Sequence, residues 1–316
     1  MGRPLTLQDN FFNQLRNKAR PMNQDGVHLN SRKNAMSIDV EDYFQVAAFK
    51  NNINPNQWDE FPCRIEQNME IVMAALDRNG VKATFFTLGW IAKRYPQMVR
   101  RIVAQGHELA SHGYGHQMIS DLTPKAFEED IRSAKAILED ISGTAIYGYR
   151  APSFSITRNT LWAHEILTKT GHTYSSSVYP IAHDLYGIPE APRFAYPANA
   201  NLMEIPATSV RIGNKNFPAS GGGFFRLFPL ELSKAIIAKV NRDDNQSAIF
   251  YCHPWEFDPN QPKVANASAK SRFRHYINLK SNTAKFDKLL GAFNWAPMRD
   301  VFLTRVSATQ AVAAAE

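Results

Sequence analysis

Cysteines and long apolar runs are scarce in this chain of 316 residues. The two cysteines, Cys63 and Cys252, stand far apart, which excludes a disulfide framework and favours a reducing compartment. No stretch is apolar and long enough to span a bilayer. Residues 1–34 are polar and lack the apolar core of a secretory signal. We therefore predict a cytoplasmic location, with residues 1–34 forming a mobile arm.

Long runs of basic residues are also missing, although the net charge is +7. The lysines and arginines are scattered and do not alternate with aromatic residues, so we expect no nucleic-acid partner. Three glycines, residues 221–223, are not followed by the lysine of a phosphate-binding loop. They favour a flexible lip over a site instead. With 44% hydrophobic residues, the chain can bury a full core.

Short apolar runs alternate with helical patterns from residue 35 onward. The repeated order predicts an α/β fold with a mostly parallel sheet, either a barrel or an open sheet. Strands are expected at residues 35–40, 81–88, 107–111, 145–149, 173–178, 202–205 and 247–252, and helices at 65–79, 91–104, 123–141, 159–169 and 230–240. We assign residues 35–258 to a catalytic domain. Residues 259–316 are expected to form an extension that packs on this domain, followed by a tail.

Candidate metal ligands follow two of the predicted strands. His112 and His116 stand four residues apart and could hold one ion, for which zinc is the usual occupant. Asp39, Glu41 and Asp42 lie together at a strand end, which is costly unless they share a cation or a proton. The alternative interpretation of the histidine segment is a surface turn, and that of the acidic segment is a helix N-terminus that attracts acidic residues. Together the two segments favour a catalytic metal site with two histidines, one carboxylate and an open position.

Two further strand ends carry candidate catalytic groups. Arg150 could hold a carboxylate through a two-pronged hydrogen bond, with a surface salt bridge as the alternative. His253 leaves a buried strand among aromatic residues, which suits a proton donor. Four side chains near these strand ends could contact a sugar substrate: Tyr114, Pro152, Phe154 and Trp255. The alternative interpretation for each is a residue of the hydrophobic core.

These segments, taken together, resemble carbohydrate esterase family 4, the NodB-type polysaccharide deacetylases. An acidic pair, a His-x-x-x-His segment, an Arg-x-Pro segment and a late His-Pro occur in that order in the family, and here they span residues 35–258. The amino-acid sequence at residues 39–46, 183–187, 253–259 and 272–276 further resembles that of the exosortase-associated (PEP-CTERM locus) branch. Members of that branch are linked to bacterial exopolysaccharide production.

The resemblance implies a distorted (β/α) barrel of about seven parallel strands that removes acetyl groups from N-acetylated amino sugars. The implied substrate is an exopolysaccharide or its lipid-linked precursor, with the exopolysaccharide assembly machinery as a candidate partner. By the same resemblance, Asp39 is the general base, Arg150 orients it, and His253 protonates the leaving amine. His112, His116 and a carboxylate would hold a divalent metal, for which we favour zinc.

The sequence departs from the family pattern at two points. The family's adjacent acidic pair is spread over Asp39–Asp42, so the metal carboxylate is either Asp42 or Glu41. We prefer Asp42, although strand alternation places Glu41 on the same face as Asp39. Serines occupy residues 175–177, where the family often has an aspartate that tunes the late histidine. Rival hypotheses are an amidase of small cyclic or ureido compounds and a catalytically silent carbohydrate-binding component of an export system.

Overall fold

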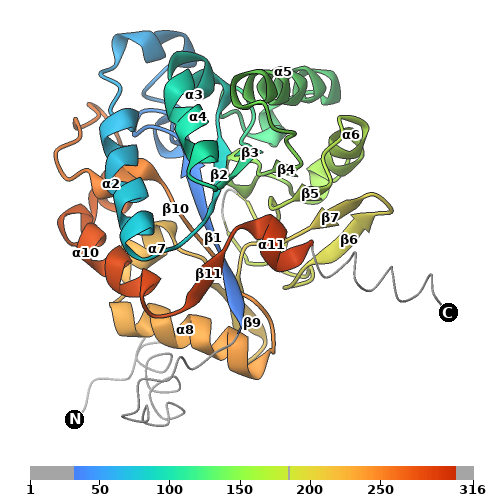
Figure 1. The fold of residues 1–316 in the computed structure, drawn as a ribbon, viewed down its shortest axis with the longest axis vertical. Helices are drawn as coiled ribbons and strands as arrows, with labels where there is room; N and C mark the ends of the chain where they lie inside the picture. Colours follow the sequence, from blue (N-terminus) through green and yellow to red (C-terminus); the bar gives the residue numbers. More distant parts are fainter. Residues whose placement is uncertain (1–31, 184–185, 304–316) are drawn as a thin grey trace.

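The computed structural model describes residues 32–183 and 186–303. Within these ranges, nine strands form one curled sheet (Figure 1). Their order is β10 (Ile249–Cys252), β1 (Lys33–Val40), β2 (Thr84–Thr87), β3 (Glu108–Ser111), β4 (Gly148–Tyr149), β5 (Tyr174–Ser175), β7 (Leu202–Glu204) and β6 (Tyr196–Asn199), with β11 (Asn294–Ala296) also paired to β1. All pairings except β6–β7 are parallel. The predicted α/β architecture is therefore confirmed, as a half-barrel.

Strand β1 has three partners in this sheet and lies next to the edge strand β10. It pairs with β2, with β10 and, at its start, with β11. Every residue of β1 after Lys33 is buried, as expected for a parallel strand that is covered on both faces. Asp39 stands next to Phe86 in the register, one residue before the strand ends. The carboxyl ends of β1, β2 and β3 consequently lie at one edge of the sheet.

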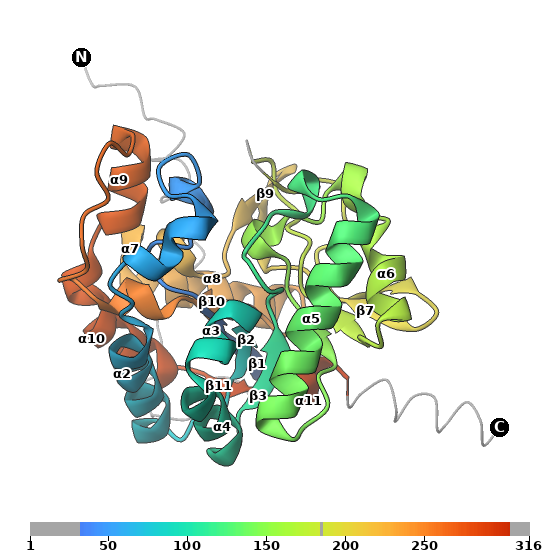
Figure 2. The same ribbon diagram turned by 90° about the horizontal axis from the view of Figure 1, so that it is seen from above.

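Helices flank the strands on opposite sides. In the view from above, α2, α9 and α10 lie on one side and α5 and α6 on the other (Figure 2). The helices are α2 (Ile65–Arg78), α3 (Gly89–Arg94), α4 (Pro96–Ala104), α5 (Pro124–Ser142), α6 (Ala163–Lys169), α7 (Gly222–Leu227), α8 (Leu230–Asp243), α9 (Ala269–Tyr276), α10 (Leu279–Leu290) and α11 (Met298–Phe302). As the sequence indicates, α5 begins with the capping hydroxyl of Thr123, which accepts the Ala126 amide at 3.2 Å.

Several boundaries differ from the predictions, mostly by a few residues. The helix expected at residues 91–104 is divided into α3 and α4, because Pro96 disfavours a helical conformation at Tyr95. Lys33 and Asn34 belong to β1 rather than to an N-terminal arm, and residues 1–31 lie outside the described residues. No break in the sheet marks the boundary predicted at residue 258, since β11 joins the sheet through its pairing with β1.

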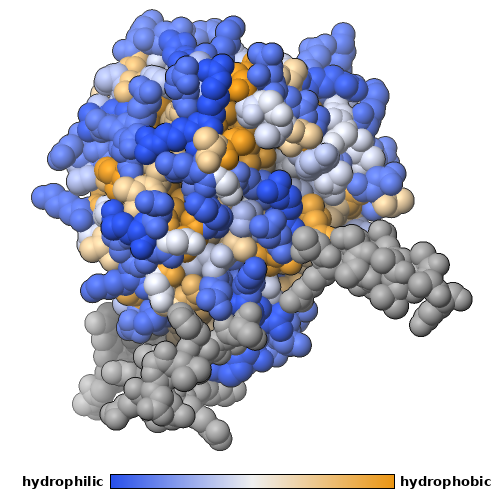
Figure 3. All heavy atoms as spheres, in the orientation of Figure 1, coloured by the Kyte–Doolittle hydropathy of each residue, from blue (hydrophilic) through white to orange (hydrophobic). Residues whose placement is uncertain are grey.

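The largest apolar cluster fills the space between the sheet and its flanking helices. Phe85 on β2, Phe250 on β10 and Phe286 on α10 are among its fully buried members, each contributing about 1.5–3 kcal/mol through burial. On the face drawn in Figure 3, hydrophilic side chains predominate and apolar ones are scattered among them. In the part of the chain that the structure describes, no helix is long and apolar enough to cross a membrane.

Candidate metal and catalytic site

Glu41, His112 and His116 meet at the carboxyl edge of the sheet. Glu41 directly follows β1, and His112 directly follows β3. Their candidate ligand atoms all lie within 4.8 Å of one another. The Glu41 Oε2 atom is 2.5 Å from His116 Nε2 and 3.9 Å from His112 Nε2. The fold thus brings the two predicted histidines together with one carboxylate.

The chemistry of this group fits a divalent cation. His112 Nδ1 lies 2.8 Å from the Arg150 carbonyl oxygen and donates to it, which leaves a lone pair on Nε2. His116 Nδ1 is buried without a hydrogen-bond partner among the described residues. Glu41 Oε2 is buried with only the close contact to His116 Nε2, and buried polar atoms left so are costly unless a ligand satisfies them. Burial lowers the pKa of His112 to about 4. Burial alone would raise the pKa of Glu41, but the neighbouring histidines hold it far below its usual range. A neutral imidazole and an ionised carboxylate are the forms that bind metal.

The turn that carries the two histidines is held from α5. Asp130 accepts the backbone N–H of Tyr114 at 2.9 Å and that of Gly115 at 3.3 Å. His116 has a φ of 51°, a left-handed conformation that a non-glycine residue adopts at a cost. Asp130 therefore fixes a strained turn. Sequence analysis missed this residue, because an acidic residue on an amphipathic helix is common and gives no signal of its own.

Asp42, our preferred metal carboxylate, does not join this group, and the preference is corrected. Its side chain is fully buried beside the N-terminus of α2. Oδ1 accepts the Tyr43 amide at 2.8 Å, while Oδ2 accepts the Arg64 amide at 2.5 Å and the Cys63 thiol at 3.0 Å. Asp42 thus satisfies free N–H groups where α2 begins. The alternation rule, which favoured Glu41, gives the carboxylate that faces the histidines.

Asp39 is oriented by Arg150, which is completely buried. Arg150 Nη1 donates to Asp39 Oδ1 at 2.6 Å and to Ser37 Oγ at 2.9 Å. Its Nη2 and Nε donate to the side chain and the carbonyl of Ser176 at 3.1 and 3.3 Å. The guanidinium therefore shares its donors among Asp39, Ser37 and Ser176. Only one of its nitrogens donates to Asp39, so the predicted two-pronged bond to a carboxylate does not form between these two described residues. The second oxygen, Asp39 Oδ2, lies 3.9 Å from His253 Nε2.

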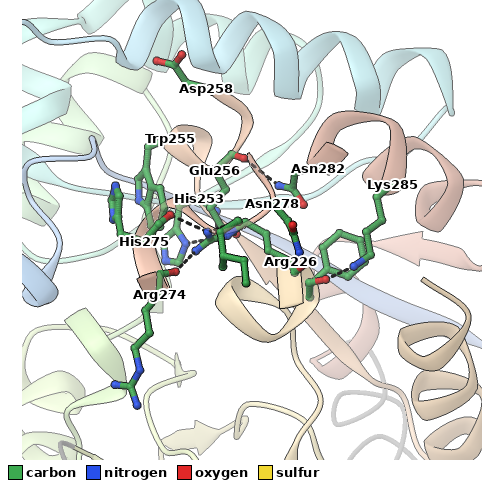
Figure 4. Close-up of polar contacts among 12 residues, drawn as sticks. Arg226, His253, Trp255, Glu256, Asp258, Arg274, His275, Asn278, Asn282 and Lys285 are labelled. Atoms are coloured by element: carbon green, nitrogen blue, oxygen red, sulfur yellow. Dashed lines mark hydrogen bonds and ion pairs between the residues drawn. The ribbon is translucent and has the colours of Figure 1, made fainter. Parts of the chain in front are cut away.

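His253 follows β10 and points its Nε2 atom between two carboxylates. That atom is 3.6 Å from Glu41 Oε1, and Nδ1 lies 2.5 Å from Glu256 Oε1 (Figure 4). Burial tends to lower the pKa of His253, but Glu41, Glu256 and Asp39 outweigh it and raise the pKa to about 9. With 18% of its side chain exposed, His253 is more accessible than Asp39 or Glu41. The arrangement places an imidazole with a raised pKa beside the carboxylates of Asp39 and Glu41.

Residues 57–175 match the protein family described as polysaccharide deacetylase. This part of the chain belongs to that family. Residues 176–303 match a second family, described as a domain of unknown function, DUF3473. The two matches adjoin between Ser175 and Ser176, so His112 and His116 fall in the first and His253 falls in the second.

Relatives and one solved structure agree with this assignment. The chain is 34% identical over 95 residues to a peptidoglycan-N-acetylglucosamine deacetylase of Bacillus cereus, a match that covers 30% of this chain and 34% of that protein. It is 32% identical over 109 residues to a chitooligosaccharide deacetylase of Sinorhizobium fredii, covering 34% of this chain and 48% of that protein. These matches span less than half of either relative. A putative polysaccharide deacetylase from Mycobacterium smegmatis shares the fold, with a TM-score of 0.56 at 17% identity over 90% of this chain and 94% of that one.

Trp255 does not present a stacking face to a sugar, and that prediction is corrected. Its ring lies between those of His253 and His275, with centroids 5.2 and 4.1 Å away and interplanar angles of 19° and 11°. Both faces are therefore covered, and the residue is 5% exposed. Its indole N–H instead donates to Glu41 Oε1 at 3.1 Å. Trp255 thus supports the carboxylate of the metal-binding group.

The remaining predicted substrate contacts differ in their exposure. Phe154 is buried against Tyr179 and Tyr251, and Pro152 is also buried. Both lie in the core, and a contact of either with a sugar stays a prediction. Tyr114 is half-buried within the histidine turn. A substrate contact at Tyr114 stays a prediction.

Proposed function

We propose that this protein is a metal-dependent N-deacetylase that removes acetyl groups from N-acetylated amino sugars of a polysaccharide. The observation that carries the proposal is the meeting of a base, an acid and a metal-binding group. Asp39 Oδ2 and Glu41 Oε1 lie 3.9 and 3.6 Å from His253 Nε2, and Glu41 adjoins His112 and His116. Family membership and the deacetylases among the relatives support the same reaction.

The residues divide the reaction among them. Asp39 takes a proton from water as the water oxygen bonds to the acetamide carbonyl carbon. His253 gives its Nε2 proton to the amine nitrogen as the carbon–nitrogen bond breaks, which yields acetate and a free amino sugar. Asp39 then releases its proton and His253 regains one from solvent. A divalent cation held by Glu41, His112 and His116 would polarise the carbonyl and make water more acidic.

Finer features of the function rest on the sequence resemblance. The segments at residues 39–46 and 253–259 support an exopolysaccharide, or its lipid-linked precursor, as the substrate. We propose zinc as the metal, because two histidines and one carboxylate form a ligand set that zinc commonly takes in catalytic sites. A cytoplasmic location and an association with exopolysaccharide assembly machinery belong to the same proposal.

The test is acetate release from an N-acetylglucosamine oligomer by metal-stripped protein, with and without added zinc. We expect zinc-dependent release that is lost in Asp39→Asn and kept in Asp59→Asn, a control at an exposed carboxylate paired with Arg94. Tight zinc binding without release under any condition would favour the rival amidase. Failure to bind zinc would overturn the metal site.

A further inference from the structure

A buried ion pair lies behind His253, outside the metal-binding group. Glu256 and Arg226 are 1% and 3% exposed. Glu256 Oε2 accepts Arg226 Nε at 2.8 Å, while Glu256 Oε1 accepts the Nδ1–H of His253 at 2.5 Å and its backbone N–H at 3.2 Å (Figure 4). The carboxylate thus connects the guanidinium to the imidazole.

Arg226 is itself fixed by the end of α9. Its Nη1 donates to the carbonyls of His275 and Ile277 at 2.7 and 3.0 Å, and its Nη2 donates to that of Arg274 at 3.0 Å. Carbonyls at a helix C-terminus lack partners within the helix and attract positive charge. With all three guanidinium nitrogens engaged, the side chain cannot swing away from Glu256.

Helix α7 is placed to deliver Arg226 to this position. Gly221, which precedes α7, forms an isolated parallel bridge with Tyr251 on β10. Its φ is 124°, and a Cβ atom there would lie 2.0 Å from the Tyr251 carbonyl oxygen. Only glycine allows this approach. The glycine segment is therefore packed against the strand that precedes His253, which corrects the expectation of a flexible lip.

Stability alone gives a weak reason for such a pair. Removing two charges from water costs about as much as their attraction returns, and apolar replacements of similar volume are often as stable. The orientation of Glu256 gives a stronger reason. A histidine that donates from one ring nitrogen has its tautomer and its ring orientation set by the acceptor.

We propose that Glu256, fixed by Arg226, is a positioning residue that holds the His253 ring with Nδ1–H toward itself and Nε2 toward the reacting atoms. The inference rests on the proposed function, since it assigns a role within that reaction. It also gives residues 176–303, the domain of unknown function, a part in the chemistry. That region supplies the proton donor, its carboxylate support and the helix end that fixes the support.

The test compares two variants that remove the buried charge pair. Arg226→Met/Glu256→Leu removes the acceptor, and Arg226→Met/Glu256→Gln keeps an accepting oxygen. We expect kcat to fall about 100-fold in the first and about tenfold in the second, with KM within about threefold of the wild type. Arg193→Met/Asp244→Leu, which removes another arginine–carboxylate pair, is the matched control and should leave kcat unchanged.

A double-mutant cycle separates positioning from a purely structural role. In a His253→Ala background, removing the pair should cause no further loss of kcat, because the group it positions is gone. An equal loss in both backgrounds, or wild-type kcat in the Leu variant, would overturn the proposal.

Nuclear magnetic resonance of the ¹⁵N-labelled His253 ring adds a readout that does not depend on the substrate. The Nδ1 proton should be fixed in the wild type and lost in the Leu variant. Unchanged ring spectra would overturn the positioning role. If the wild type releases no acetate from any substrate, the proposed function fails, while the ring spectra still decide whether Glu256 holds His253.

Discussion

Two neighbouring carboxylates, Glu41 and Asp42, should show opposite responses to the loss of charge. In Asp42→Asn, an amide replaces the carboxylate that receives the Arg64 amide, the Cys63 thiol and the Tyr43 amide. In Glu41→Gln, an amide replaces the carboxylate beside the two histidines. We expect Asp42→Asn to lose stability and keep zinc affinity, and Glu41→Gln to lose zinc affinity and keep more of its stability.

The size of the Asp42 effect follows from its partners. Losing hydrogen bonds to a buried charged acceptor costs about 1.5–3 kcal/mol, and losing a negative charge at a helix N-terminus adds about 0.3–1 kcal/mol. A total near 2–3 kcal/mol corresponds to a fall in Tm of roughly 5 °C in a chain of this size. Glu41 Oε2 lies 2.5 Å from His116 Nε2, and Oε1 accepts the Trp255 indole N–H at 3.1 Å. A glutamine keeps an oxygen for the Trp255 bond, so the Tm of the metal-free protein should fall by less in Glu41→Gln than in Asp42→Asn.

Zinc affinity gives the second measurement. Removing a direct ligand should weaken binding by more than the 10–100-fold that loss of a supporting residue costs. Calorimetric titration of zinc into each variant, with thermal melts of the metal-free proteins, measures both quantities, and Asp59→Asn serves as the control. If Asp42→Asn weakens zinc binding as much as Glu41→Gln does, Asp42 is a ligand and our geometric reasoning is refuted.

Three other perturbations test the surroundings of the site. Trp255→Phe keeps an aromatic ring but removes the N–H that holds Glu41, so zinc affinity measured by calorimetry should fall about 10–100-fold; an unchanged affinity would contradict a supporting role. Asp130→Asn weakens the hold on the turn that carries His116, so kcat should fall about tenfold with a loss of about 1–3 kcal/mol of stability, measured by acetate release and denaturant titration. Burial holds the pKa of His172 at about 3, below the ordinary 6.5, so protonation favours the unfolded chain and stability falls as the pH drops below 6.5. His172→Phe should lose about 2 kcal/mol less stability than the wild type between pH 6.5 and 5. Denaturant titrations at the two pH values measure this difference. Equal losses in the two proteins would show that His172 is not responsible for the pH dependence.

The sequence allowed the fold and much of the composition of the site to be predicted. Alternating apolar runs and helical patterns indicated parallel strands, whose carboxyl ends share one edge of a sheet. Asp39, Arg150 and His253 each follow or end such a strand, and the structure brings them together. Periodicity was sufficient there because β1, β2 and β3 are buried strands with an unambiguous direction.

Features that depend on contacts between distant segments were not predictable in the same way. The choice between Glu41 and Asp42 depends on the start of α2, which receives Asp42. The exposure of Trp255 depends on His275, which covers one of its faces from α9. The pairing of Glu256 with Arg226 requires α7 to lie against β10. No local pattern specifies any of these contacts.

The pairing of β1 with strands from the end of the chain has a consequence for folding. Ala35 on β1 pairs with Ile249 on β10. Because β1 is synthesised early and β10 late, this pairing cannot form until most of the chain has been synthesised. Such non-local pairing slows folding and leaves an apolar strand edge open to other chains in the meantime. The histidines of the turn can assemble against β1 and β2 before β10 exists, but His253 cannot. A chain halted before residue 249 would therefore hold Asp39, His112 and His116 without His253, and would leave one edge of β1 unpaired.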